Sequence, residues 1–506
     1  MSHLALTKEK IQGMRTLFVI QIFSTLSFSV LYSTLVLYTN KGLHLGADMA
    51  VAITGSFVAF NYFLHLLGGF IGGRFLSYRL LFSLSMLFQT AGCLILSVSS
   101  LGSLFWGLAI FLTGCGLNVT CVNCMLTQLF ESHDKNRETA FLWNYSGMNI
   151  GFLIGFTMSG IFQIYQNYSI LFLMAGASNV ITLIITLCNW KYLKDVGTHL
   201  THASLPKQLR LGIIGIAMLV ILTLALRWLI HHSEFSNEFI LIVGAIMLFV
   251  IAAIAFQQRV KEARKKVWAY FILCLASLVF WTLYQMAPMG LTLFVLHNVD
   301  RVVMGFTVPP QWLLNINTII IILAGPTLAH ICKKLRAKGY IIRIPIQFAI
   351  ALVLIGIGFA LIPVGIHFAN PQGISAFSWV IISYVLQSLG EILLSPIGYA
   401  MIGQLIPSKL QGLMMGTWLM VVGVAATLSN FFSQMGFDDS KMRNPLDTNP
   451  AFSETFNLLG WSSILTGGIL FALYPFLKKL IQEKGNHADP HPYNAPEETP
   501  YTISEK

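Results

Sequence analysis

The feature that most constrains this chain is a series of apolar runs, each long enough to cross a membrane. A helix needs about 20 apolar residues to span the hydrocarbon core of a bilayer. Runs of that length lie near residues 17–38, 50–72, 80–98, 104–130, 139–163, 169–190, 211–230, 238–257, 267–295, 312–332, 343–366, 376–404, 412–435 and 457–477. The sequence therefore predicts an all-α membrane protein with 14 transmembrane helices, and the lipid bilayer is its first expected partner.

The charge of the chain supports this interpretation. Of its 506 residues, 56% are hydrophobic and 10% are charged, which excludes a soluble globular protein. The formal net charge of +11 could suggest a nucleic-acid partner. The basic residues lie in short loops between apolar runs, however, where they set membrane orientation, so no nucleic-acid partner is expected.

The basic loops alternate with short or acidic ones. Those expected on one side of the membrane contain Lys8, Lys10 and Arg15; Arg74 and Arg79; Lys135 and Arg137; Lys191, Lys194, Lys207 and Arg210; Arg259 to Lys266; Lys333 to Lys338; and Lys478 and Lys479. Because loops rich in Lys and Arg stay in the cytoplasm, both termini are expected to be cytoplasmic.

The spacing of the runs predicts two halves of six helices separated by an extra pair. We expect a cytoplasmic N-terminus (1–16), an N-terminal six-helix bundle (17–192), a linker with two additional helices (193–266), a C-terminal six-helix bundle (267–482) and a disordered cytoplasmic tail (483–506). Two six-helix halves around a central site are typical of the major facilitator superfamily fold. No metal-ligand spacing, nucleophile elbow or P-loop is present, so we expect no metal, no cofactor and no enzyme activity.

One carboxylate stands out in the run 376–404. Glu391 is its only charged residue between Phe377 and Gln404. A charge near the bilayer centre costs at least about 2.5 kcal/mol and persists where it faces a water-filled cavity or a partner. Glu391 is therefore predicted to be a ligand or proton site; the alternative is a neutral carboxyl held by helix packing.

Several motifs, in order along most of the chain, resemble the proton-dependent oligopeptide transporter family, especially its bacterial di- and tripeptide permeases. They are Asn136-Arg137 to Phe141 with Tyr145-x-Gly147-Met148-Asn149, Phe280-Trp281 with Leu283-Tyr284 and Asn298-Val299-Asp300, Trp312 with Asn315-Ile316-Asn317, Leu389-Gly390-Glu391 to Ser395-Pro396-Ile397-Gly398, and Gly412 to Trp418. Each motif is weak alone, but their order and spacing together are specific.

The resemblance implies a peptide-sized cavity. In it, Glu391 would bind a substrate ammonium, a charge-assisted contact that also offsets the burial of the carboxylate. Tyr62, Asn149 and Asn317 would supply hydrogen bonds at fixed points. Buried amides in membrane spans also join helices to one another, which is the alternative for the two asparagines.

Three further residues complete the implied site. Trp281 and Trp418 would wall pockets for substrate side chains, and Ser395 would shape the helix beside the carboxylate. Bundle packing or lipid contact is the alternative for both tryptophans.

The first helix departs from the family's E-x-x-E-R pattern, which couples protons to transport. Its three charged positions are Gln21, Ser24 and Thr25, the expected lysine of the fourth helix is Val119, and the expected carboxylate of the seventh is Gln285. Removing both signs together avoids leaving a buried charge unpaired, which would cost several kcal/mol. We therefore expect a folded protein with altered proton coupling.

Four residues are candidates for gating or proton coupling. Asp300 and Arg301 follow the seventh helix and are expected to form an outer gate, and His297 precedes them. His65 lies three residues after Tyr62, on the same helix face. Histidine titrates near neutral pH, so His65 could replace the lost relay; the alternative is a structural histidine bonded to neighbouring backbone.

We interpret the chain as a monomeric secondary transporter of the bacterial inner membrane, moving di- or tripeptides or related amine-bearing molecules, with protons as a further expected partner. One alternative is an amine or drug exporter on the same scaffold. Another, which the lost coupling charges favour, is a nutrient sensor that binds without transporting.

Overall fold

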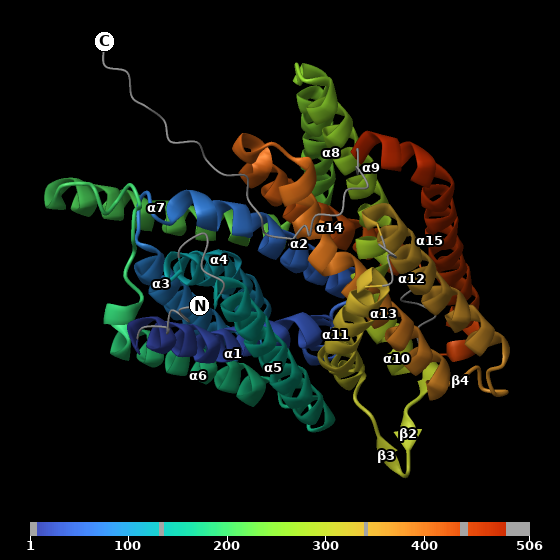
Figure 1. The fold of residues 1–506 in the computed structure, drawn as a ribbon. Helices are drawn as coiled ribbons and strands as arrows, with labels where there is room; N and C mark the ends of the chain where they lie inside the picture. Colours follow the sequence, from blue (N-terminus) through green and yellow to red (C-terminus); the bar gives the residue numbers. More distant parts are fainter. Residues whose placement is uncertain (1–7, 131–135, 338–342, 436–443, 482–506) are drawn as a thin grey trace.

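The computed structural model describes residues 8–130, 136–337, 343–435 and 444–481, and these form a bundle of long helices (Figure 1). The predicted tail at 483–506 and the first seven residues of the predicted N-terminal segment lie outside the described residues.

The N-terminal half contains six long helices, blue to teal in Figure 1. They are α1 (Lys8–Leu37), α2 (Ala47–Ile71), α3 (Tyr78–Leu96), α4 (Leu101–Gln128), α5 (Asn136–Ile164) and α6 (Tyr168–Cys188), with short helices at η1 (Tyr38–Gly42) and η2 (Trp190–Tyr192). Polar side chains cap the N-termini of two of these helices. The Ser77 hydroxyl accepts from the Leu80 amide before α3, and Ser100 and Ser103 form a capping box at α4.

The C-terminal half contains six long helices and one short one. They are α9 (Lys261–Tyr284), α10 (Gly290–Asn298), α11 (Leu313–Ala337), α12 (Ile344–His367), α13 (Phe377–Leu405), α14 (Ser408–Met435) and α15 (Pro445–Ile481), with η3 (Pro310–Trp312) before α11. Short strands near their ends pair β1 (Val299–Asp300) with β4 (Ser375–Ala376) in parallel, and β2 (Val302–Val303) with β3 (Phe306–Thr307) as a hairpin.

The remaining two helices are the central pair, α7 (Leu205–His231) and α8 (Ser233–Gln257). α7 packs on α4, where the hydroxyls of Thr113 and Thr223 are 2.9 Å apart, while α8 packs on α2, α9 and α14. α8 therefore contacts both halves, and Figure 1 shows it beside α9.

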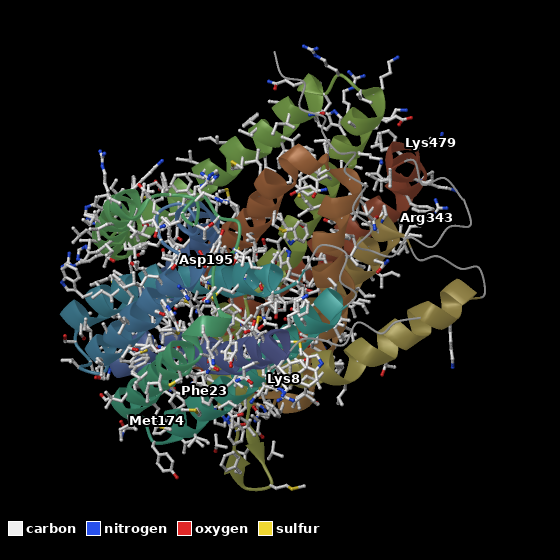
Figure 2. All side chains as sticks on the ribbon, turned by 60° about the vertical axis from the view of Figure 1, so that its left-hand side comes forward. Lys8, Phe23, Met174, Asp195, Arg343 and Lys479 are labelled. Carbon is white, nitrogen blue, oxygen red and sulfur yellow. The ribbon has the colours of Figure 1, made fainter. Side chains whose placement is uncertain are left out.

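The arrangement confirms the predicted two six-helix halves and central pair. Among the described residues, thirteen helices are long and apolar enough to span a membrane. In α11 the apolar part, with η3, covers Pro310–Ala324 before the basic residues at the helix end. Many large apolar side chains are exposed on the helix surfaces. Arg343, directly before α12, and Lys479, near the end of α15, lie at one end of the C-terminal half (Figure 2).

One predicted span is divided. The apolar run 267–295 was expected to form one helix, but α9 ends at Tyr284 and α10 begins at Gly290. Pro288 explains the break, because proline has no amide hydrogen and disfavours helical geometry in the residue before it.

The two halves meet along two seams. α2 and α14 pack along their length, with Gly55 against Asn430 at one end and Gly416 against Leu66 toward the other. The second seam joins α5 to the start of α11, at the ends away from the basic loops. There, the Trp312 indole donates to the carbonyl oxygen of Thr157, and the Asn315 side-chain amide donates to the Thr157 hydroxyl. Each hydrogen bond is 3.0 Å long. The halves are therefore closed together on the side opposite the basic loops, called here the outer side.

Small residues set the helix spacing within each half. At the α3–α4 crossing, a Cβ added to Gly92 would lie 2.7 Å from both the Gly107 carbonyl oxygen and the Phe111 Cβ. We expect Gly92→Val to lower the free energy of unfolding by about 1–3 kcal/mol, because backbone atoms cannot give way as a flexible side chain can. Thermal unfolding of the purified protein measures this. Gly468→Val in α15, where nothing lies within 4 Å, is the control; equal midpoints for the two variants would contradict the prediction.

Candidate functional site

Glu391 lies in the middle of α13 and is held by neutral hydrogen-bond donors. The Asn317 amide on α11 donates to its carboxylate over 2.6 Å and also contacts the Ser388 hydroxyl at 3.2 Å. The Tyr284 hydroxyl at the end of α9 is a further donor to this carboxylate. Three helices of the C-terminal half therefore position one carboxylate.

Tyrosines from both halves lie near this carboxylate. Tyr32 on α1 lies within electrostatic range of Glu391, Tyr62 and Tyr384. The hydroxyl groups of Tyr32, Tyr62, Tyr284 and Tyr384 thus come from α1, α2, α9 and α13, respectively. The site combines one carboxylate with polar aromatic side chains and lies where the two halves face each other, joined by the Tyr32–Gln285 hydrogen bond. The peptide-sized cavity stays a prediction.

No basic side chain of the described residues forms an ion pair with Glu391; the hydrogen bonds to it come from Asn317 and Tyr284. A buried carboxylate is costly unless it is paired and hydrogen-bonded. The arrangement satisfies its hydrogen bonding but supplies no opposite charge. The site is therefore suited to a cation brought by a ligand.

On α1, neutral side chains joined by hydrogen bonds stand at the positions where the resemblance predicts charged residues. The Gln21 amide donates to the Thr25 hydroxyl over 2.9 Å, and the Asn144 amide on α5 donates to the Gln21 carbonyl oxygen over 3.3 Å. All three side chains are buried. The sequence change therefore leaves a connected polar contact between α1 and α5.

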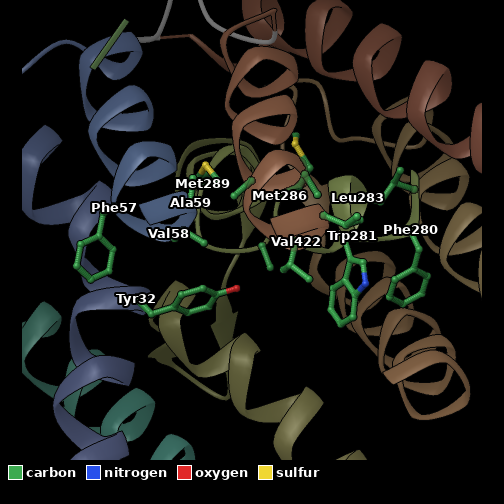
Figure 3. Packing of buried hydrophobic residues seen from close by; sticks show 14 of the residues in the cluster. Tyr32, Phe57, Val58, Ala59, Phe280, Trp281, Leu283, Met286, Met289 and Val422 are labelled. Atoms are coloured by element: carbon green, nitrogen blue, oxygen red, sulfur yellow. The ribbon is translucent and has the colours of Figure 1, made fainter. Parts of the chain in front are cut away.

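Gln285 forms a neutral link between the halves. Its side-chain carbonyl accepts a hydrogen bond from the Tyr32 hydroxyl over 3.0 Å. Figure 3 shows Tyr32 on α1 pointing its hydroxyl across the gap toward Trp281 and Val422. The same Gln285 amide nitrogen is buried and has no hydrogen-bond partner among the described residues. Gln285 stands where the resemblance predicts a carboxylate. Its side chain thus joins α1 to the end of α9 without a charge.

The other predicted polar residues have different environments. Asn149 is buried, and its amide donates to the Tyr145 carbonyl one turn back in α5 over 2.9 Å. Tyr62 is half-buried on α2. Ser395 is half-buried one turn after Glu391 on α13. Their roles in substrate binding stay predictions.

The two tryptophans also differ. Trp281 is 7% exposed, lies 5.3 Å from Tyr284 between ring centres, and its indole nitrogen has no hydrogen-bond partner among the described residues. Trp418 is 1% exposed and lies against Gly398 of α13 and Phe348 of α12. The surroundings of Trp418 favour the alternative of bundle packing, whereas Trp281 lies beside the carboxylate site.

His65 joins two helices of the N-terminal half. Its ring is edge-on to Tyr62 at 5.9 Å, and its Nδ1 lies 2.8 Å from the carbonyl oxygen of Gly116 on α4. Since that oxygen can only accept, Nδ1 carries the hydrogen. This contact is the backbone-bonded arrangement considered as the alternative to a proton relay.

The predicted outer residues lie at the outer end of the C-terminal half. Asp300 is exposed and accepts from the Val302 amide over 3.0 Å, rather than pairing with Arg301. Arg301 donates to the Val308 carbonyl oxygen over 2.9 Å. Burial, with the positive charges of Lys41 and Arg301, lowers the pKa of His297 to about 4.

Sequence reasoning missed three contributors to these sites. Tyr284 lies within the motif around Trp281, three residues later and thus on its helix face, a signal that could have identified it. Tyr32 is a polar aromatic residue in an apolar run. Lys41 ends the first apolar run, but its proximity to His297 depends on the tertiary fold.

The sequence matches known transporters over most of its length. Residues 79–444 match the POT family. The dipeptide and tripeptide permease B of Salmonella typhimurium is 24% identical over 472 residues, which cover 93% of this chain and 96% of the permease. The dipeptide and tripeptide permease A of Escherichia coli is 26% identical over 474 residues, which cover 92% and 93%.

Solved structures share the fold. A peptide transporter POT in complex with sulfate matches with a TM-score of 0.80 and 23% identity, covering 93% of this chain and 95% of that one. Tetrameric PepTSo2 matches with a TM-score of 0.80 and 20% identity, covering 93% and 99%. The fold is therefore that of the major facilitator superfamily with a central helix pair.

Proposed function

Since this chain belongs to the POT family, we propose that it is a secondary active transporter, and not an enzyme, that moves di- or tripeptides or related amine-bearing small molecules across the bacterial inner membrane. The observation that carries the proposal is Glu391, a carboxylate bonded to the neutral donors Asn317 and Tyr284 and without a cationic partner among the described residues.

The charge of the site defines the substrate chemistry. A substrate ammonium would complete the pairing of Glu391 by a charge-assisted hydrogen bond. Trp281 and Tyr62 would contact the rest of the molecule. Because Gln21, Ser24, Thr25 and Val119 carry no charge, these four positions offer no cation to a substrate carboxylate.

The transport cycle would be alternating access between the two six-helix halves, 17–192 and 267–482. By the positive-inside rule, the closed outer side would face away from the cytoplasm, and both termini would be cytoplasmic. Opening would require the Tyr32–Gln285 hydrogen bond and the contacts of Trp312 and Asn315 with Thr157 to break.

Proton coupling would differ from the E-x-x-E-R mechanism, because its three positions hold neutral side chains joined by hydrogen bonds. Protons remain a proposed partner through Glu391 and His297. A monomer is the proposed functional unit, because one chain supplies both halves of the site.

The test is competition between dipeptides and their C-terminally amidated forms for binding and uptake in proteoliposomes. We expect the amidated form to bind at least as tightly as the free acid, since Glu391 recognises the amine. Loss of binding by N-acetylated dipeptides is the matched control for amine recognition.

A clear preference for the free acid would overturn the proposed substrate chemistry. Saturable binding without uptake in either direction would instead identify a sensor, the function that the lost coupling charges also favour. Export without uptake would identify the exporter.

A further inference from the structure

Three basic side chains at the outer ends of the two halves lie close enough for their charges to act on one another. Lys41 lies in η1, directly after α1 of the N-terminal half, whereas His297 lies in α10 and Arg301 follows β1 in the C-terminal half. The charges of Lys41 and Arg301 act on each other and on His297. These three residues, called the outer cluster, therefore come from both six-helix halves.

The backbone holds Arg301 in place but leaves part of it unused. Its Nη1 donates to the Val308 carbonyl oxygen over 2.9 Å, and its Nη2 makes a longer contact of 3.4 Å with the Leu296 carbonyl oxygen. Its Nε is buried without a hydrogen-bond partner among the described residues, and so is the Nε2 of His297. Buried nitrogens of this kind are normally hydrogen-bonded.

No carboxylate of the described residues balances the outer cluster. The neighbouring Asp300 instead accepts from the Val302 amide. Burial and the positive charges of Lys41 and Arg301 act on His297, and all three oppose its protonation. Like charges brought together in a partly buried place destabilise one another unless an opposite charge is added.

We propose that Lys41, His297 and Arg301 form a binding site for a small anion, a carboxylate or an inorganic anion, at the outer mouth between the two halves. The site is separate from Glu391 and does not depend on what the protein transports. An anion there would supply the missing counter-charge and an acceptor for the unpartnered nitrogens, and it would bridge the two halves on their closed side.

The site should take up a proton together with the anion. With the pKa of His297 at about 4, this side chain is neutral between pH 5 and pH 7 while the site is empty. An added negative charge favours the protonated form and raises this pKa. By linkage, anion affinity then increases as the pH falls through the raised pKa, and it levels off only below about pH 4.

The test is thermal unfolding of the purified full chain in detergent, titrated with sodium chloride or sodium formate. A bulky sulfonate keeps the ionic strength constant. We expect saturable stabilisation that is roughly tenfold tighter at pH 5 than at pH 7. His297→Asn should reduce this pH dependence to less than about twofold, since one titrating group has been removed.

Variants identify the residues. Arg301→Gln and Lys41→Gln should each weaken anion binding roughly tenfold, the effect of losing one charged contact, while Arg301→Lys should retain part of it. Lys479→Gln, on the basic-loop side, is the matched control. Because Lys41 is exposed, its variant stays informative if Arg301→Gln fails to fold.

Formate and chloride, with free-acid and amidated dipeptides as competitors, distinguish a substrate carboxylate from an inorganic anion. Stabilisation that does not saturate, affinities within twofold of the control in both charge variants, or an unchanged pH dependence in His297→Asn would overturn the proposal. None of these outcomes depends on amine binding at Glu391.

Discussion

Glu391→Gln is expected to abolish high-affinity substrate binding while leaving the fold intact. Glutamine has nearly the same shape and can still accept from Asn317, whose amide donates to Glu391 over 2.6 Å. It cannot pair with a substrate ammonium. Removing one partner of a buried charge pair costs roughly 2–5 kcal/mol, so the affinity for an amine-bearing ligand should fall about 30-fold or more.

Equilibrium binding and proteoliposome uptake of the same ligand measure this effect. Glu454→Gln in α15 is the matched control, because Glu454 is exposed and remote from the site in sequence and fold. The thermal midpoint without ligand should change little, which separates lost binding from lost folding. An affinity within threefold of the unmodified protein would show that Glu391 does not recognise the amine.

Gly160→Leu is expected to stop transport by a different route. On the outer side, the indole of Trp312 packs directly against Gly160 and donates to the Thr157 carbonyl oxygen over 3.0 Å. A leucine side chain cannot share that space. Overpacking costs about 1–3 kcal/mol, and here the cost falls on the outer-closed state, so uptake should fall about tenfold or more.

Substrate binding should change much less, because Gly160 is on α5 near the outer seam and Glu391 is on α13. Uptake and binding measured on one preparation separate the two effects. Gly468→Leu in α15, where nothing lies within 4 Å, controls for added bulk. Normal uptake by Gly160→Leu would show that closure at this seam is not required.

The sequence predicted the helices well because membrane spans depend on local composition. Every apolar run except the ninth became one long helix, and the grouping into six, two and six followed from their order alone. The division of the ninth run shows the limit of this reasoning. Pro288 was visible, but hydropathy treats a broken apolar segment and a continuous one alike, and prolines do occur within spanning helices such as α13.

The site was less predictable, because its contacts join distant parts of the chain. The cost of a charge in an apolar run identified Glu391, and the resemblance identified Asn317, but their direct contact depends on α11 lying beside α13. The sequence identified Gln285 as a position without the expected charge. It could not identify the hydrogen-bond partner Tyr32, because Tyr32 belongs to the other half. Trp418 shows that a motif can identify a residue without showing whether its side chain lines a cavity or packs between helices.

The seam between α2 and α14 also has a mechanical consequence. These helices pack along their length, and α8 lies against both, so this contact would be the pivot of the alternating access proposed above. α5 and α11, joined at their outer ends, form the opposite rim. A small rotation about this pivot would produce a larger displacement at the rim, where the side chains of Trp312 and Asn315 donate to Thr157 over 3.0 Å each.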